Sequence, residues 1–510
     1  MTVFEIFKRI AQTAPTKIAF IQADQAVTYE ELWAMAMTEA QRLQSIGLSP
    51  RDRCLVSLGN SIETASVLLG VFSTYAIPVL INEEAPESHL SHAVEETGCI
   101  VSIQNCNTTK PLTGIGTTLS TETTLTNTHK KEPSADLRNT LPDNGDTKHT
   151  ASILFTSGST GMPKGVAQSH SSLIQTCNSI ANSLGLKKTD SILCSIPWSF
   201  DYGFGQFLST ILLGITQILP EKNEPFSISE CIEQHRPTIF PGVPSLFAAL
   251  LRGVSPIRNT DCSSIRLVTS TGSKLHHSLR DDLFRLLDTS SFSFNYGLTE
   301  TYRSASLPLE LARTDSDSVG FAIPGVNLQI VREDGSEAAA DEEGEIVHSG
   351  IGTFQGYWGN SEATKKTRRN IRNKKQGTNR ESPKNHPAVF TGDIGRIDER
   401  GMLYLSGRHD RQLKSMGVKV NPEEIESLMQ NFPMIEEIAI VSSYNEIIGD
   451  KLIAVVVSRP GINDPISDIK KLCADLFGQY MRPRQYIMTH RLPRTTSGKI
   501  DYVEVKKLVQ

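Results

Sequence analysis

The sequence predicts an α/β protein with a large, multi-subdomain N-terminal region of parallel sheets flanked by helices and a small, mobile α+β domain at its C-terminus. Two observations lead to this prediction. A chain of 510 residues is too long for one ordinary hydrophobic core. Strand patterns also alternate with helix patterns, which is typical of βαβ units. After about Arg408 these units become short, so we expect residues 1–406 and 407–510 to form separate domains.

The alternation is clearest in the N-terminal part of the chain. The segment MTVFEIFKRIAQTAP has the apolar spacing of an amphipathic helix and lacks the basic head of a signal peptide. Thr28 and Glu31 form a capping-box pattern at the start of a second helix, which ends at Gly47. Further expected elements are a strand at Cys54–Leu58, a helix at Ser61–Tyr75, and strands at Ala76–Ile81, Ser152–Phe155, Ser191–Ile196, Ile239–Gly242 and Ile265–Thr269.

Two segments differ in composition from the rest of the chain. Asn107–Thr150 is rich in Thr, Asn and Lys and poor in large apolar residues, so we expect a long surface connection with at most one strand. Lys365–Lys384 contains nine Lys or Arg residues and one acid, Glu381. We favour a solvated loop insertion here, and a patch for an anionic partner is the alternative.

Composition and charge exclude several classes of protein. A hydrophobic content of 38% and a charged content of 21% are ordinary for a soluble globular protein, and a net charge of -5 argues against a dedicated nucleic-acid binder. The eight cysteines form no C-x-x-C pair, so we expect no zinc or redox site and a reducing compartment. The longest apolar region, Ser191–Leu219, is interrupted by Pro197 and Asp201, so we expect no membrane-spanning helix and a cytoplasmic protein.

A glycine-rich loop follows the strand expected at Ser152–Phe155. The string Ile153–Val166 (ILFTSGSTGMPKGV) passes into small and hydroxyl-bearing residues, which let backbone N–H groups approach phosphate oxygens. A Walker A loop requires G-x-x-x-x-G-K-[ST], but here Pro163 precedes the lysine and Gly165 follows it, so a P-loop NTPase is disfavoured. The expected phosphate-binding residues are Thr156, Ser157, Gly158, Ser159, Thr160, Gly161 and Lys164.

The same fourteen-residue string resembles the signature of the adenylate-forming (ANL) superfamily, which includes AMP-binding acyl-CoA synthetases, nonribosomal-peptide adenylation domains and beetle luciferases. Further motifs follow in the family's order, so the resemblance covers nearly the whole chain. It implies an AMP-forming acid–thiol ligase that uses ATP and Mg²⁺ to activate a carboxylic acid as an acyl-adenylate and then transfers the acyl group to a thiol. It also implies that the C-terminal domain is a mobile lid.

Asn295–Glu300 (NYGLTE) looks like the family's N-x-Y-G-x-T-E motif. In such enzymes the aromatic ring packs on adenine, the threonine meets the α-phosphate and the glutamate holds Mg²⁺, so these roles fall on Tyr296, Thr299 and Glu300. Mg²⁺ prefers oxygen ligands shared with substrate phosphates, and it neutralises charge on the departing pyrophosphate. The residues that the resemblance assigns to the adenine and ribose are Gly272, Ser273, Asn295, Tyr296, Gly297, Asp393 and Arg408.

Two further motifs bracket the predicted domain boundary. Thr391–Asp393 resembles the T-G-D motif, whose carboxylate accepts hydrogen bonds from the ribose hydroxyls, and its place just before Gly407–Arg408 makes it specific. The resemblance makes Asp410 the hinge residue on which the lid swings. The Lys414–Val420 loop would then face the active site in the second half-reaction, where Gly417 would let a pantetheine arm pass close to the backbone.

The C-terminal string Leu492–Asp501 resembles the family's P-x-T-x-x-G-K motif, which makes Lys499 the catalytic lysine. A loosely placed ammonium group can bridge the substrate carboxylate and an α-phosphate oxygen. It would thereby align the attack and stabilise the negative charge of the transition state. Together with Thr299 and Glu300, Lys499 forms the expected catalytic set.

The acyl pocket is expected along Pro197–Gln206, Gly242–Ser245, Ser270–Gly272 and the residues after Tyr296, and it includes Phe200, Asp201 and Val243, with Gly417 at the thiol tunnel. Phe200-Asp201 resembles the F-D pair of amino-acid adenylation domains, in which the aspartate binds the α-ammonium group. The longer strings S-F-D-Y-G and T-E-T-Y-R-S instead look like acyl-CoA ligases of bacterial biosynthetic clusters. We therefore favour a carboxylic or fatty acid as substrate and CoA as acceptor.

Three alternatives stay open. The first is an amino-acid ligase that loads the phosphopantetheine of a carrier protein, which would make an acyl carrier protein a partner of the chain. The second is an oxidative, luciferase-like enzyme, for which no residue gives positive support. The third is a non-catalytic nucleotide-binding homologue, against which the presence of Lys499, Glu300 and Asp393 argues.

Overall fold

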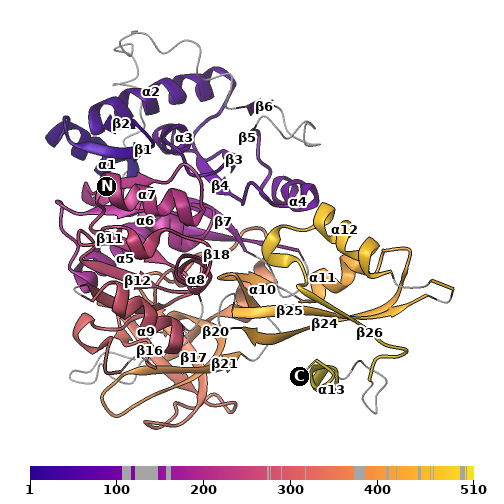
Figure 1. Cartoon of the computed structure of the whole chain (residues 1–510). Coiled ribbons are helices and arrows are strands. Elements are labelled where there is room, and N and C mark those ends of the chain that lie inside the picture. The colour runs from indigo at the N-terminus through magenta and orange to yellow at the C-terminus, as the bar shows by residue number, and fades with distance from the viewer. Residues whose placement is uncertain are drawn as a thin grey trace.

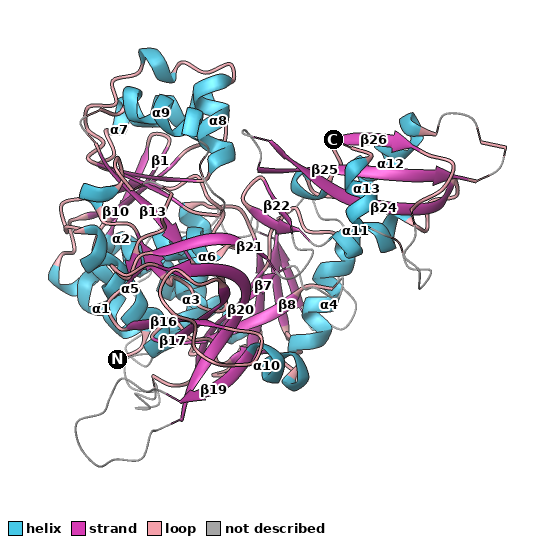
Figure 2. Cartoon of the chain, turned by 90° about the horizontal axis from the view of Figure 1, so that it is seen from below, coloured by secondary structure: helices cyan, strands magenta, loops and turns pink. Residues whose placement is uncertain are grey.

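The computed structural model describes residues 1–105, 117–120, 147–156, 162–272, 275, 277–288, 290–315, 317–372, 385–408, 413–420, 422–445, 449–459, 461–462, 465–493, 500 and 502–509. Within them the chain folds into a large N-terminal region and a small C-terminal domain that lies beside it (Figure 1). Helices flank the sheets in both parts (Figure 2). The predicted α/β fold class is therefore confirmed.

Two large sheets form the centre of the N-terminal region. Counting described residues only, the first has nine strands in the order β15 (Phe321–Ala322), β14 (Ala305–Ser306), β13 (Ser291–Tyr296), β12 (Leu267–Ser270), β11 (Ile239–Gly242), β9 (Ser191–Leu193), β10 (Thr216–Leu219), β1 (Ile18–Gln22) and β2 (Gln25–Thr28). On the same basis the second has seven strands in the order β18 (Gly356–Tyr357), β8 (Lys164–Ser169), β7 (Thr150–Thr156), β4 (Ile77–Leu80), β3 (Arg53–Ser57), β5 (Val101–Gln104) and β6 (Thr117–Ser120).

Helices on both faces of the first sheet build the main hydrophobic cores. Those that share a core with both sheets are α1 (Val3–Thr13), α2 (Tyr29–Ser45), α3 (Ile62–Ser73), α5 (His170–Leu184) and α6 (Asp201–Leu213). Those that cover the other face of the first sheet are α7 (Pro225–His235), α8 (Pro244–Arg252) and α9 (His277–Leu286). Each large apolar side chain buried there, such as Phe207 or Phe247, contributes about 1.5–3 kcal/mol.

A third sheet completes the N-terminal region. Its strands are β16 (Val326–Val331), β17 (Gly344–Gly350), β20 (Asn385–Ile397), β19 (Arg368–Arg372) and β21 (Leu403–Arg408), and they pair antiparallel. The remaining elements of this region are α4 (Glu87–Thr97), α10 (Ser361–Thr367) and the short 3-10 helices η3 (Ile257–Asn259) and η4 (Leu309–Leu311).

The C-terminal domain is one sheet with helices on both faces. Its strands are β23 (Val418–Val420), β22 (Leu413–Ser415), β25 (Gly449–Ser458), β24 (Ile435–Asn445) and β26 (Gln485–Met488), and its helices are α11 (Pro422–Met429), α12 (Ile466–Leu476), α13 (Tyr502–Lys507) and the short η5 (Gln479–Met481). Alternate residues of β24 and β25 face α11 and α12 on one side and α13 on the other. His89 on α4 of the large region contacts Glu424 on α11, and Figure 2 shows these two helices beside each other.

Most predicted elements in the described residues are confirmed. Thr28 accepts a hydrogen bond from the backbone of Glu31 and starts α2 through the predicted capping box. The strand expected at Cys54–Leu58 is β3, and the helix expected at Ser61–Tyr75 is α3. Within Asn107–Thr150 the structure describes β6, the start of β7 and the turn before it, and the rest of that segment lies outside the described residues.

The basic segment Lys365–Lys384 differs from the predicted loop where it is described. Its first residues belong to the end of α10, and the next form β19, which pairs with β20. The guanidinium carbon of Arg369 lies 4.4 Å from the centroid of the Phe390 ring. Backbone pairing and this stacking stabilise a strand whose sequence is dominated by charge, and charged residues are common on edge strands because they discourage pairing with other chains.

None of the helices among the described residues combines the length and the apolar character that crossing a bilayer requires.

Candidate active site

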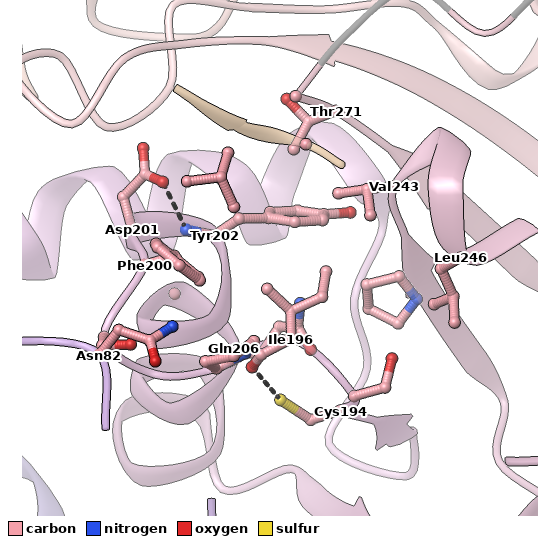
Figure 3. A pocket seen from close by; sticks show the side chains of 18 of the residues that line it. Asn82, Cys194, Ile196, Phe200, Asp201, Tyr202, Gln206, Val243, Leu246 and Thr271 are labelled. Atoms are coloured by element: carbon pink, nitrogen blue, oxygen red, sulfur yellow. Dashed lines mark hydrogen bonds between the residues drawn. The ribbon is translucent and has the colours of Figure 1, made fainter. Parts of the chain in front are cut away.

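A cavity of about 890 Å³ opens where the first sheet meets the C-terminal domain. Four neighbouring parallel strands, β9, β11, β12 and β13, end at this cavity, which is where ligands bind in open α/β sheets. The residues that follow these strand ends and line the cavity are Cys194–Pro197, Val243, Thr271, Gly272, Gly297, Leu298 and Thr299. Figure 3 shows the Tyr202 ring directed toward Val243 within it.

The ends of the glycine-rich loop lie next to each other at the cavity. Thr156 ends β7 and pairs with Lys164 at the start of β8, so this antiparallel pair holds the two ends of the loop together. Thr156 lines the cavity. The ammonium nitrogen of Lys164 lies 5.2 Å from the centroid of the Tyr357 ring. Ser157, Gly158, Ser159, Thr160 and Gly161 lie outside the described residues, and their phosphate contacts stay a prediction.

Glu300 is a buried carboxylate with one oxygen engaged. Its Oε1 accepts a hydrogen bond of 2.7 Å from the hydroxyl of Tyr357. Its Oε2 is buried and has no hydrogen-bond partner among the described residues. A buried carboxylate oxygen needs a proton donor or a cation, because leaving it without either is costly. The arrangement therefore fits the Mg²⁺ site that the sequence motif implies, since Mg²⁺ binds through one or two carboxylates and substrate phosphates.

Two of the expected adenine and ribose residues contact each other. The Tyr296 hydroxyl donates a hydrogen bond of 2.7 Å to Oδ2 of Asp393, and both side chains are buried. The backbone of Asp393 pairs with that of Arg408 between β20 and β21. The amide of Asn295 instead bonds within the sheet, where its Oδ1 accepts a 2.6 Å hydrogen bond from the hydroxyl of Ser306. Asn295 thus positions the end of β13.

A hairpin of the C-terminal domain forms one wall of the cavity. Ser415 pairs with Val418, so Met416 and Gly417 are the two turn residues, with φ of 52° and 80°. Positive φ at both positions is the geometry of a type I′ turn, which favours glycine. A Cβ on Gly417 would lie 3.2 Å from Cβ of Val243. A Cβ on Gly272, whose φ is 92°, would lie 3.3 Å from the Gly417 carbonyl oxygen. The two glycines allow this close approach.

The start of α6 forms the acyl side of the cavity. Phe200 is the N-cap residue, and Oδ1 of Asp201 accepts a 2.8 Å hydrogen bond from the backbone N–H of Tyr202. The Tyr202 hydroxyl lies 2.6 Å from Oγ1 of Thr269, and burial raises the pKa of Tyr202 to about 12. Tyr202 is therefore a neutral side chain at physiological pH.

Family comparisons agree with this geometry. The sequence model of the AMP-binding enzyme family matches residues 7–358, which is more than half of the chain. The chain belongs to the AMP-binding enzyme family. The sequence model of the AMP-binding enzyme C-terminal domain matches residues 424–499.

Several relatives of this AMP-binding enzyme are CoA ligases by name. A probable CoA ligase of Humulus lupulus is 28% identical over 514 residues, covering 96% of this chain and 90% of the relative. 4-Coumarate–CoA ligase 3 of Arabidopsis thaliana is 28% identical over 493 residues, covering 93% of this chain and 85% of the relative. The predicted reaction class is confirmed: the AMP-binding enzyme is an AMP-forming acid–thiol ligase that activates an acid as its adenylate.

Two solved structures of o-succinylbenzoate CoA synthetase from Bacillus subtilis share the fold of this AMP-binding enzyme. Both are 22% identical and cover 99% of this chain, and this chain covers 98% of each. The structure of a double mutant bound with the product analogue OSB-NCoA has a TM-score of 0.85. The structure in complex with the acyl-adenylate intermediate OSB-AMP has a TM-score of 0.70.

The structure brings most described site residues of the AMP-binding enzyme together. The cavity lining includes Thr156, Phe200, Asp201, Val243, Gly272, Gly297, Thr299 and Gly417. Glu300 follows Thr299 directly, and Tyr296 and Asp393 contact each other. The side chain of Arg408 and the residues Ser273, Asp410 and Lys499 lie outside what the structure describes, so their roles stay predictions.

Sequence reasoning missed one contributor of the AMP-binding enzyme. Tyr357 contacts both Lys164 and Glu300, yet it lies far from both in sequence and no motif marks it. Gln206 lines the acyl side of the cavity from α6, within the region Pro197–Gln206 where the sequence predicted the acyl pocket.

Proposed function

We propose that this AMP-binding enzyme uses ATP and Mg²⁺ to join a carboxylic acid to AMP and then transfers the acyl group to the thiol of CoA. The observation that carries this proposal is the β22–β23 hairpin at the cavity. Gly417, in the C-terminal domain, lines the same cavity as Thr299 and the acyl-side residue Val243. A small residue at that point leaves room for a narrow thiol arm beside the reacting carbonyl.

The difference between two TM-scores supports the second half of the proposal. The higher TM-score, 0.85, belongs to the synthetase structure with a CoA product analogue, and the lower, 0.70, to that with the acyl-adenylate. We therefore infer that the described arrangement is the one for thiol capture. The domain boundary would lie between residues 406 and 407, and rotation about Asp410 would bring Lys499 to the cavity for the first half-reaction.

In the first half-reaction a carboxylate oxygen of the acid attacks the α-phosphorus of ATP, and the bond to pyrophosphate breaks. Thr299 would hold the α-phosphate, while Thr156, Lys164 and the loop between them would hold the departing pyrophosphate. Glu300 would hold Mg²⁺, which would supply positive charge that stabilises this leaving group. Lys499 would bridge the carboxylate and the α-phosphate. Gly272, Ser273, Tyr296, Gly297, Asp393 and Arg408 would bind adenine and ribose, and Asn295 would position the end of β13 beside them.

In the second half-reaction the sulfur of the thiol attacks the acyl carbon, and AMP leaves with the carboxylate oxygen. The residues around Gly417 would line the path of the thiol. We place the reaction in the cytoplasm, because the described cysteines are all buried and none forms a disulfide, as expected in a reducing compartment.

The test is ATP–pyrophosphate exchange with a library of carboxylic acids, followed by thioester analysis. We expect exchange with a subset of acids, and a thioester when CoA is added. Lys499→Ala should abolish exchange and leave ATP binding largely intact. If the folded protein catalyses ATP–pyrophosphate exchange with no acid, the proposed adenylation is wrong. Thioester formation on a phosphopantetheinylated carrier protein, and not on CoA, would show that the proposed acceptor is wrong.

A further inference from the structure

Arg303 is held at the acyl side of the cavity by a tight turn. Tyr302 has a φ of 61°, which is unusual for a residue with a side chain. The backbone of Arg303 donates a 2.7 Å hydrogen bond to the carbonyl of Thr301. A Cβ on Gly297 would lie only 2.6 Å from the Tyr302 carbonyl oxygen and 2.9 Å from Cα of Arg303. The adenylation motif and Arg303 are therefore packed directly on each other, and strain of this kind gathers at functional sites.

The guanidinium group of Arg303 is buried beside the cavity. The residue is 6% exposed and lines the cavity, and its guanidinium carbon lies 5.7 Å from the centroid of the Tyr202 ring. Its Nη1 is buried without a hydrogen-bond partner among the described residues. Burial lowers the pKa of Arg303, and Tyr202, Asp201 and Tyr302 oppose that effect. Asp201 offsets part of the positive charge, but the buried Nη1 still needs a hydrogen-bond acceptor.

Three more polar groups at this cavity lack partners. Both amide atoms of Gln206, the hydroxyl of Ser195 and the hydroxyl of Tyr302 are buried with no hydrogen-bond partner among the described residues. Gln206 is 5% exposed and lies on the side of the cavity away from Thr271 (Figure 3). Water can satisfy these groups in the empty cavity. An alkyl chain would displace that water and leave them unpaired, so the cavity suits an acid with polar atoms beyond its reacting carboxylate.

The charge of Arg303 also bears on the role of Asp201. The two residues interact electrostatically, so Asp201 already faces a resident cation. An α-ammonium group would have to compete with that cation and would add a second positive charge to a buried site. The pair Asp201 and Arg303 therefore disfavours an amino acid as the substrate.

We propose that the acid activated by this enzyme carries a second carboxylate, which binds the guanidinium of Arg303 and accepts a hydrogen bond from Gln206. The inference rests on the proposed function and names its substrate class. Arg303 is then the specificity-determining residue, and the plain fatty acids that the sequence allowed are poor substrates. Two parallel N–H donors of a guanidinium match the two oxygens of a carboxylate, which gives the subsite both charge and orientation.

The experiment compares diacids with their own monomethyl esters, which keep the shape and lose the second charge. Suitable pairs are glutaric, adipic, suberic and terephthalic acids with their monoesters. For each pair, binding to the full chain is measured by the shift in Tm, and kcat/KM is measured by ATP–pyrophosphate exchange. We expect at least one pair in which the diacid is preferred by about a hundredfold or more, because a site built to pair a substrate group rejects the analogue that lacks it.

Arg303→Met should lose that preference in both measurements, and Arg303→Lys should keep part of it. Arg313→Met is the matched control, because Arg313 stacks on Phe284 and Phe292 away from the cavity, and it should keep the preference. No preference for the diacid in any pair, or an equal preference in Arg303→Met, overturns the inference. Exchange with monoacids alone would overturn it and leave the proposed function standing. If the enzyme binds a diacid through Arg303 but catalyses no exchange, the diacid subsite is supported and the proposed function is overturned.

Discussion

The two sides of the cavity differ in how their polar groups are satisfied. On the nucleotide side, Tyr296 donates to Asp393 and Tyr357 donates to Glu300, each at 2.7 Å. On the acyl side, Gln206 and Nη1 of Arg303 are buried without partners among the described residues. Tyrosine hydroxyls thus fix two carboxylates of the nucleotide side before its ligand binds, and the second Glu300 oxygen fits a cation. The acyl side depends on its ligand to complete it.

The nucleotide side determines the class of reaction, and the acyl side determines which acid is accepted. ATP is common to all AMP-forming ligases, so its site can be built from fixed residue pairs. The acid differs between enzymes, and the residues that bind it show their role only through burial and missing partners. Changes on the nucleotide side should therefore lower activity with every acid equally, whereas changes on the acyl side should alter the preference among acids.

The largest effect is expected for Glu300→Ala. Loss of the carboxylate removes the proposed Mg²⁺ ligand, and removal of one transition-state contact costs about 10²–10³ in kcat. ATP–pyrophosphate exchange should fall by that factor with every accepted acid, and the order of preference should stay the same. Glu310→Ala, at an exposed position, is the control and should match the unmodified enzyme. If Glu300→Ala changed the order of preference among acids, the nucleotide side and the acyl side would not act separately.

Gly417→Ala should impair thioester formation and spare adenylation. The substitution adds a Cβ 3.2 Å from Val243 at a φ of 80°, and such strain costs about 1–3 kcal/mol, or roughly ten- to hundredfold in rate. Single-turnover transfer from a preformed acyl-adenylate to CoA measures this step. The control is Gly461→Ala, since Gly461 has a φ of 84° but no atom within 4 Å of its added Cβ. Equal losses in both variants would mean that strain alone, and not the cavity wall, explains the result.

His89→Ala should weaken the thiol-capture arrangement by a smaller amount. His89 on α4 contacts the carboxylate of Glu424 on α11, and both side chains are buried. Loss of the imidazole leaves the buried Glu424 carboxylate without this contact, which costs about 1–3 kcal/mol, so we expect about a tenfold slower transfer to CoA with adenylation unchanged. The exposed His386→Ala is the matched control. A slower adenylation step in His89→Ala would contradict the assignment of this contact to the second half-reaction.

The smallest effect is expected for Tyr202→Phe. The variant keeps the ring beside Arg303 and removes the hydroxyl that lies 2.6 Å from Oγ1 of Thr269. One neutral hydrogen bond is worth about 1 kcal/mol, so KM for the acid should rise roughly fivefold with little change in KM for ATP. Tyr444→Phe, at an exposed tyrosine, is the control. A larger rise in KM for ATP than for the acid would contradict the division of the cavity.

The sequence predicted the nucleotide side better than the acyl side for a physical reason. Thr299 and Glu300 lie in one short string, so their spacing is fixed by the chain itself. Tyr357 joins this group through the pairing of β18 with β8, which no local pattern encodes. Arg303 stands in the quoted string T-E-T-Y-R-S, but its buried guanidinium depends on Gly297 and on the positive φ of Tyr302. Burial of that kind is a property of the folded chain.

The fold shows the same limit. The helices α2 and α3 were predicted because caps and apolar spacing are local signals. The strand β19 was missed because its charged sequence is held by pairing with β20. Lys499→Ala tests the role of Lys499, and phosphate binding by Ser157–Gly161 stays a prediction.

The central claim is that the acid is activated as its adenylate and then passed to CoA. The most direct measurement uses an acid labelled with oxygen-18 in its reacting carboxylate, chosen from those that drive exchange, together with ATP, Mg²⁺ and CoA. We expect one oxygen-18 atom in the AMP that is produced and the acyl group on CoA as a thioester. Label found in inorganic phosphate with ADP as the product, or unlabelled AMP, would contradict it.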